Sequence, residues 1–195
     1  MVKSKEYKRF FPFTKIRKSQ KKAISFILKQ FIQNQKKYVI LEAGTGIGKS
    51  AIGVTVSRYL QYYHKKNQIK HEIPIIKEPY YNSSYFLTTQ KILQQQYIED
   101  FGKPIVDDIE DLYQLQSISS SKNYECQYHS GVSCSEGRKA LQYVNKSSEF
   151  FKTCSKQCRY KSTKNKFVGE HTDGITNFSY FLAETSNLQE IKPKE

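Results

Sequence analysis

The stretch that decides the fold reads Ala43-Gly44-Thr45-Gly46-Ile47-Gly48-Lys49-Ser50, and it follows the apolar run Tyr38-Val39-Ile40-Leu41. Its glycines allow positive φ and close backbone approach, so successive N–H groups can point at phosphate oxygens. Lys49 can then reach the β- and γ-phosphates, and the Ser50 hydroxyl is placed to ligate Mg²⁺ at the positive end of a following helix. Ala43 stands where the strict pattern has Gly, but the strand, loop and helix context is right. We therefore predict that residues 43–50 bind ATP and Mg²⁺, with Lys49 and Ser50 in the catalytic roles, rather than forming a simple glycine turn.

Length and charge limit the possible functions. A chain of 195 residues suffices for about one domain with an insertion. It carries 32 Lys and Arg against 18 acidic residues, a net charge of +14 that is spread along the chain. This excess predicts a polyanionic partner such as nucleic acid. The alternative is that an AT-rich genome inflates the lysine content.

The chain shows no signal for secretion or membrane insertion. Its first residues, Met1-Val2-Lys3-Ser4-Lys5-Glu6, contain no apolar signal-peptide core, and no later segment approaches an uninterrupted apolar run of the length that spans a bilayer. Because a phosphate loop also implies access to ATP, we expect an intracellular protein of the cytoplasm or nucleus. Cysteines in such a compartment are reduced.

Hydrophobic periodicity predicts helices that alternate with strands in the first half of the chain. Apolar residues recur at helical spacing over about residues 17–34, which indicates an amphipathic helix. Four further elements are expected: a buried strand at Tyr38–Leu41, a helix at Ala51–Tyr63, a strand at Tyr85–Thr89 and a helix at Gln90–Phe101. This alternation is typical of a parallel α/β sheet.

The pattern changes from Leu112 onward, where the four cysteines lie. Residues 117–123 are rich in serine and are interpreted as a connector, and a helical pattern resumes over Gly174–Glu184. The cysteines are spaced C-x7-C-x19-C-x3-C in a polar, basic segment. Such a segment gains most from a metal centre that holds it together. Four thiolates suit either a [4Fe–4S] cluster or Zn²⁺, and the spacing does not choose between them.

The order of these motifs resembles the iron–sulfur helicases of superfamily 2, the XPD/DinG-like family. The matching segments are EAGTGIGKS at 42–50, FLTTQ at 86–90, KNYEC at 122–126 and GITNFSYFL at 174–182. The resemblance implies an α/β RecA-like P-loop domain with an incomplete parallel sheet over 1–111. It also implies an inserted, mostly helical or irregular cluster domain over 112–170 and a truncated return segment over 171–195. It favours a [4Fe–4S] cluster over zinc, with Cys126, Cys134, Cys154 and Cys158 as the ligands.

The same resemblance suggests further contact residues. Arg17 and Gln20 are similar to the element that recognises adenine, and a Gln amide can both donate to and accept from an adenine edge. Gln20 could instead be an ordinary polar position on the first helix. Thr88, Thr89 and Gln90 would contact the DNA backbone, or else form a strand end followed by a helix N-cap.

Part of the hydrolytic machinery is not found in the sequence. ATP hydrolysis needs an acidic strand end and a cationic finger, and the stretch Ile105-Val106-Asp107-Asp108 reads as an acidic connector. In the family, the DEAH box would follow a few residues beyond Glu195, and a second RecA-like domain would follow that. We therefore expect the N-terminal fragment of an ATP-dependent DNA helicase, which alone binds nucleotide weakly and unwinds nothing.

The expected partners are single-stranded or forked DNA and the missing C-terminal helicase segment, and no membrane. The first alternative is a non-catalytic, zinc-binding nucleic-acid module that uses nucleotide as a switch. A different P-loop enzyme, such as a nucleotide kinase, is the second alternative.

Overall fold

A computed structural model describes residues 6–67, 84–102, 115–156, 158–169 and 173–189. It divides into two compact units, the first formed by Met1–Ser84 and Tyr97–Gln114 and the second by Tyr85–Gln96 and Leu115–Glu195. The acidic stretch at 105–108 and the expected domain boundaries near residues 112 and 171 lie outside the described residues. Each unit is described by itself.

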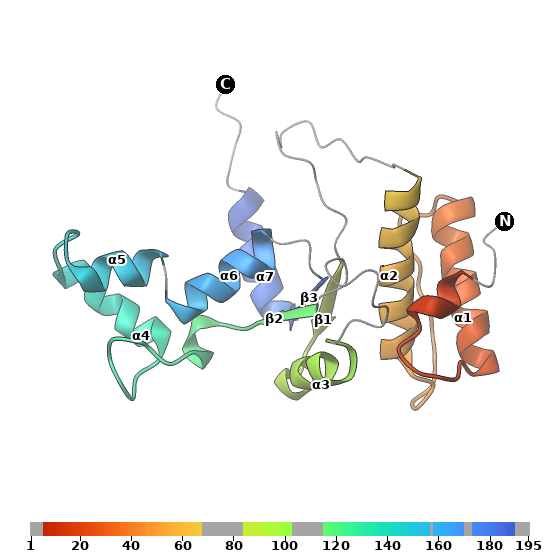
Figure 1. The fold of residues 1–195 in the computed structure, drawn as a ribbon, viewed down its shortest axis with the longest axis horizontal. Helices are drawn as coiled ribbons and strands as arrows, with labels where there is room; N and C mark the ends of the chain where they lie inside the picture. Colours follow the sequence, from red (N-terminus) through yellow and green to blue (C-terminus); the bar gives the residue numbers. More distant parts are fainter. Residues whose placement is uncertain (1–5, 68–83, 103–114, 157, 170–172, 190–195) are drawn as a thin grey trace, which may run out of the picture. The chain divides into compact units, whose positions relative to one another are not determined.

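Helices make up the described elements of the first unit (Figure 1). They are the 3₁₀ turn η1 (Tyr7–Phe10), α1 (Lys18–Leu28), the π-helical turn η2 (Lys29–Gln33), α2 (Lys49–Lys66) and the last residues of α3 (Lys91–Phe101). The helices expected at 17–34 and 51–63 are confirmed as α1 with η2 and as α2. Ile24 and Leu28, one helical turn apart on α1, are fully buried, as the amphipathic pattern requires.

An aromatic cluster packs η1 against α2. The rings of Phe10 and Tyr59 lie edge to face with centroids 6.0 Å apart, and both side chains are almost fully buried. The Tyr59 hydroxyl donates to the Glu6 carboxylate at 3.3 Å, and Lys66 forms an ion pair with the same carboxylate at 3.2 Å. Arg58, also buried, donates to the carbonyl of Phe101 at 2.6 Å. A guanidinium at the carboxyl end of α3 complements the negative pole of that helix.

The prediction of a buried strand at Tyr38–Leu41 is wrong. The segment forms no strand, and Tyr38 and Ile40 are 87% and 93% exposed. A strand is buried only where neighbouring strands pair with it and cover it. Among the described residues of the first unit there is no strand to do so.

The second unit contains a three-stranded parallel sheet in the order β1-β3-β2 (Figure 1). The strands are β1 (Tyr85–Thr88), β2 (Leu115–Ile118) and β3 (Asp173–Asn177). In the register, Ile175 of β3 lies beside Phe86 on one side and Ser117 on the other. The strand at 85–89, the helix at 90–101 and the parallel sheet are thereby confirmed. α6 (Arg159–Gly169) packs on β2, and α7 (Phe178–Gln189) packs on β1 and β3.

Two expectations for this unit are wrong at the level of secondary structure. The helix expected over Gly174–Glu184 starts only at Phe178, because the preceding residues form β3. Ile175 and Thr176 are β-branched and fully buried in this central strand, a position that favours such residues. Residues 117 and 118, which were expected in the connector over 117–123, belong to β2. The side chains of Leu115 and Ile118 are buried in the core.

Between β2 and β3 the chain makes a long excursion that carries all four cysteines. It contains the 3₁₀ turn η4 (Ser121–Asn123), α4 (Cys134–Lys139), η5 (Ala140–Tyr143), α5 (Glu149–Lys156) and α6. Within the described part of the chain, no helix is both long and apolar enough to cross a bilayer.

Tyr59 makes the first unit sensitive to alkaline pH. Burial, and then the Glu6 carboxylate, raise the pKa of Tyr59 from 10.0 to about 12. Because the pKa is higher in the folded state, the neutral phenol stabilises the fold fully below pH 10, and this contribution is lost as the pH rises toward 12. We expect the free energy of unfolding, followed by urea denaturation from pH 8 to pH 11.5, to fall by about 1–2 kcal/mol more for the wild type than for Tyr59→Phe. Tyr38→Phe, at an exposed tyrosine, should follow the wild type, and parallel profiles for all three proteins would contradict this assignment.

Candidate nucleotide-binding loop and cysteine pocket

The phosphate loop leads directly into α2, an 18-residue helix that begins at Lys49. Gly46 and Gly48 have φ values of 73° and 85°, in the left-handed region that favours glycine. The Gly48 carbonyl accepts the N–H of Ile52 at 3.1 Å and closes the first helical turn. The N–H groups at the start of a helix have no intrahelical partner and attract anions. The loop therefore has the backbone form that phosphate binding requires.

Lys49 and Ser50 lie where the loop becomes helix. The Lys49 ammonium donates to the carbonyls of Ala43 at 2.9 Å and Gly44 at 3.2 Å. An ammonium has three donors, and these two hydrogen bonds use two of them. Ser50 is half-buried in the first turn of α2.

The amide of Gln20 ties this loop to the start of α1. Its Nε2 donates to the carbonyl of Ile47 at 2.9 Å, and its Oε1 accepts the backbone N–H of Arg17 at 2.9 Å. Gln20 is only 5% exposed, and the Arg17 guanidinium donates to the carbonyl of Gly46 at 2.9 Å. Arg17 and Gln20, the two residues that are expected to contact adenine, thus both donate hydrogen bonds to backbone carbonyls of the loop. Their contact with adenine stays a prediction.

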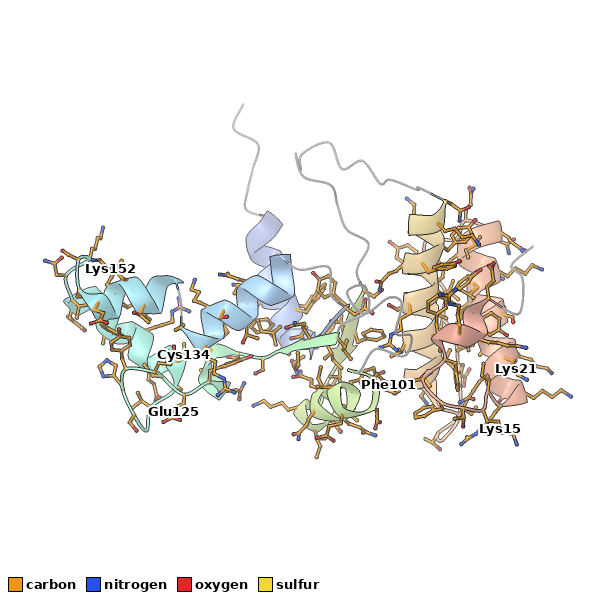
Figure 2. The ribbon with its side chains drawn as sticks, in the orientation of Figure 1. Lys15, Lys21, Phe101, Glu125, Cys134 and Lys152 are labelled. Atoms are coloured by element: carbon orange, nitrogen blue, oxygen red, sulfur yellow. The ribbon has the colours of Figure 1, made fainter. Side chains whose placement is uncertain are left out.

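The cysteines come together in the second unit, where all four side chains line one small cavity. All are free thiols; Cys134, Cys154 and Cys158 are buried and Cys126 is half-buried. Figure 2 shows Cys134 at the start of α4, with Glu125 on the loop that precedes it. The four cysteines therefore lie around a common cavity, and their role as metal ligands stays a prediction.

A tight loop brings the first two cysteines to the same place. The N–H of Cys126 donates to the carbonyl of Val132 at 2.9 Å, and the N–H of Cys134 donates to the carbonyl of Tyr124 at 2.6 Å. Gly131 turns the loop with a φ of 77°. Ser133 then caps α4 in a reciprocal pair with Glu136, which fixes the position where Cys134 enters the helix.

The other two cysteines lie on α5 and directly before α6. The N–H of Cys158 donates to the carbonyl of Thr153 at 3.0 Å, and the Cys158 carbonyl accepts the N–H of Ser162 at 2.8 Å. Gly137, on α4, lies so close to the Sγ of Cys126 that a Cβ at this position would overlap the sulfur. Its role was missed in the sequence, where the only available signal was a glycine three residues after Cys134.

Burial and nearby thiols raise the pKa of two of the four cysteines, Cys134 and Cys154. Burial, and then the neighbouring Cys158, raise the pKa of Cys134 to about 11, while Arg138 acts in the opposite direction. Burial, followed by Cys158 and Cys126, also raises the pKa of Cys154. Within the described residues, no three His, Cys, Asp or Glu side chains meet in the arrangement of a metal site. The structure thus brings four thiols to one cavity without placing them as ligands.

The residues that are expected to contact DNA, Thr88, Thr89 and Gln90, lie at the carboxyl end of β1. The Thr88 hydroxyl accepts the backbone N–H of Gln90 at 3.2 Å, and the carbonyl of Thr89 accepts from Asn177 at 3.2 Å. Thr88 thus forms a side-chain turn at the end of β1, directly before α3 begins at Lys91. Contact with DNA stays a prediction.

The steric demands of the loop lead to a test with glycine variants. A Cβ on Gly48 would lie 2.6 Å from Nε2 of Gln20 at a positive φ, whereas Gly44 has ordinary φ and its nearest neighbour would lie at 3.8 Å. We expect Gly48→Ala to lower the free energy of unfolding by about 2 kcal/mol or more, measured in urea, because strain and overlap add. The control Gly44→Ala should stay within about 0.5 kcal/mol of the wild type. Equal losses in the two variants would show that Gln20 does not constrain the loop.

The comparisons with known proteins agree with this geometry. The sequence matches the family model described as type III restriction enzyme, res subunit (ResIII), over residues 13–192. No curated protein and no solved structure gives a significant match. The parallel three-stranded sheet with its helices is compatible with a partial RecA-like helicase domain. With the match covering most of its length, the chain belongs to the ResIII family, which is a superfamily 2 helicase-type domain.

Proposed function

We propose that this chain is the nucleotide-binding N-terminal part of an ATP-dependent DNA helicase of the XPD/DinG-like iron–sulfur type. One observation carries the proposal. The loop of residues 43–50 combines positive φ at Gly46 and Gly48 with the start of α2 and the Lys49 side chain, in a chain of a helicase-type family.

In this proposal, ATP replaces the interactions that Lys49 makes with the loop itself. The β- and γ-phosphates offer the ammonium charged acceptors in place of the neutral carbonyls of Ala43 and Gly44. Hydrogen bonds to charged acceptors are the stronger ones. Ser50 supplies the hydroxyl for Mg²⁺, which neutralises charge on the phosphates. Arg17 and Gln20 keep the loop in position and contact adenine.

We further propose that the cysteines hold a [4Fe–4S] cluster, with Cys126, Cys134, Cys154 and Cys158 as its ligands. Their placement around one cavity supports this assignment, and four thiolates are the usual donor set of such clusters. When bound, the cluster would brace the excursion between β2 and β3, in a structural role more than a redox one.

A single zinc ion is the second candidate for this position. The cavity between the thiols has a volume of about 10 Å³, comparable to the space for one water molecule. A single ion needs less rearrangement of the thiols than a cluster does, while the same four ligands satisfy tetrahedral zinc. This candidate corresponds to a nucleic-acid-binding module that uses its nucleotide as a switch.

Single-stranded DNA is the partner that the charge of the chain supports. The net charge of +14 suits a polyanion, and Thr88, Thr89 and Gln90 would contact its backbone. We propose that the acidic residue and arginine finger for hydrolysis come from a C-terminal helicase segment that completes the motor.

Nucleotide titration tests the central part of the proposal. We expect Lys49→Ala to weaken ATP·Mg²⁺ binding by at least about tenfold in isothermal titration calorimetry, because a charge-assisted hydrogen bond to phosphate contributes about 1.5–3 kcal/mol. Lys36→Ala removes an exposed lysine from the same unit and should bind like the wild type. Equal affinities for all three proteins would refute nucleotide binding at this loop.

Metal analysis separates the two candidates for the cysteine pocket. We expect anaerobically purified protein to hold about four iron and four sulfide per chain, with visible absorbance of a thiolate-ligated cluster. Cys154→Ser should lose most of this content, while Ser135→Ala, a change beside Cys134, should keep it. One zinc per chain and no colour would identify the second candidate, and protein free of both metals would refute a metal centre.

A further inference from the structure

Basic residues are concentrated in the segment from Tyr7 to Leu41. This segment contains ten Lys and Arg residues, and all 18 acidic residues of the chain lie outside it. An AT-rich genome would raise the lysine content over the whole chain, but it would not remove acidic residues from one segment. A local surplus of one charge therefore points to a partner of the opposite charge.

Three of these lysines form a line along α1. Lys18, Lys22 and Lys29 are exposed, and Lys29 continues the helix in a helical backbone conformation. Spacings of four and seven residues bring them to one face of the helix, along a line of about 16 Å at 1.5 Å per residue. Another side of α1 packs on α2, where Ile24 and Leu28 are fully buried.

No acidic residue of the described part of the chain pairs with this line. The ion pair of the first unit joins Lys66 to Glu6 and uses none of the three lysines. Like charges four residues apart on a helix, such as Lys18 and Lys22, repel each other. A partner that brings carboxylates to this face removes the repulsion, so its binding is favoured by charge complementarity.

Phe26 selects the chemistry of the partner. Its ring is 45% exposed, four residues after Lys22 and three residues before Lys29, so it neighbours both on the helix surface. A nucleic-acid backbone offers negative charge to the lysines but no apolar group to cover the ring. An acidic protein segment that also carries apolar side chains offers both, as interfaces with an aromatic centre and a charged rim do.

We propose that this face of α1 docks an acidic, amphipathic segment of a partner protein. Carboxylates of the segment pair with Lys18, Lys22 and Lys29, and an apolar side chain of the segment covers Phe26. The contact goes beyond the proposed function, because it needs neither the nucleotide nor a metal centre. Exposed ion pairs contribute little each and are screened by salt, so the association is weak and reversible.

Fluorescence anisotropy with the full chain and a labelled peptide that repeats Asp-Phe-Glu-Leu four times tests the proposal. We expect the wild type to bind this peptide at low salt and to lose affinity as salt is added. Lys22→Gln and Lys29→Gln should each weaken binding about two- to fivefold, the effect of one exposed ion pair. Lys139→Gln changes an exposed lysine of the second unit and should bind like the wild type.

Phe26→Ser supplies a readout that loss of charge cannot imitate. It should weaken binding about fivefold without changing the salt dependence, because it removes apolar contact area and no charge. Tyr38→Ser, at an exposed aromatic residue outside α1, is the matched control. A second peptide that repeats Asp-Ser-Glu-Ser has the same charge without apolar residues. The wild type should bind it about fivefold more weakly than the first peptide, and Phe26→Ser should bind the two peptides equally.

The outcomes distinguish a protein partner from nucleic acid. The proposal is overturned if the wild type does not bind the first peptide, if it binds both peptides equally, or if the lysine and Phe26 variants match their controls. It is also overturned if Lys22→Gln and Lys29→Gln weaken binding of a short DNA duplex and leave peptide binding unchanged, which would assign the face to nucleic acid. None of these results decides the proposed function, which the ATP·Mg²⁺ titration and the metal analysis test separately.

Discussion

The hydrogen bonds of the Gln20 amide hold the nucleotide-binding part of the molecule together. One end of the amide closes the first turn of α1 through the N–H of Arg17, and the other end holds the carbonyl of Ile47. A buried amide with both ends satisfied is stable, but it needs backbone within reach on each side. Gly48 lies close enough only because it lacks a side chain. Gly48 is therefore required for two reasons: it adopts the positive φ of the loop, and it leaves space for the Gln20 side chain of α1 beside the loop.

The second unit depends in a similar way on its central strand. β3 pairs with β1 and β2 on either side, although about half of the chain's length separates β1 from it. Its side chains are buried, and the Thr176 hydroxyl donates to the carbonyl of Ile118 at 2.8 Å. This arrangement aligns three strand ends, and with them Lys91, Lys122 and Asn177, along one edge. Residues far apart in sequence thereby line one pocket.

Sequence patterns predict the elements whose structure depends mainly on neighbouring residues in the chain. The phosphate loop, α1, α2, α3 and β1 follow from glycine spacing and from apolar periodicity, which depend on neighbouring residues alone. The pattern over Gly174–Glu184 predicts a helix where β3 lies, because so short an apolar run has no decisive period; the segment is a strand because β1 and β2 pair with it on both sides. The apolar run Tyr38–Leu41 predicts a strand but forms none, because an apolar run becomes a strand only where a neighbouring strand can pair with it. Gly137 could not be identified beforehand, because its role depends on how closely α4 approaches the Cys126 sulfur.

The thiols contribute to the packing of the excursion between β2 and β3 as protein core. Cys134 and Cys158 pack with Ile118 and Tyr160 in one apolar cluster, and a protonated thiol behaves there as a small hydrophobic residue. The pKa of Cys134, raised to about 11, keeps it in that form at neutral pH. A bound cation or cluster would reverse this preference, because it stabilises the thiolates and releases their protons. Arg138 already acts in that direction, as its charge opposes the rise in pKa at both Cys134 and Cys154. If the proposed metal centre forms, the same side chains would change from core residues to ligands, and metal binding would then also determine how the excursion is packed.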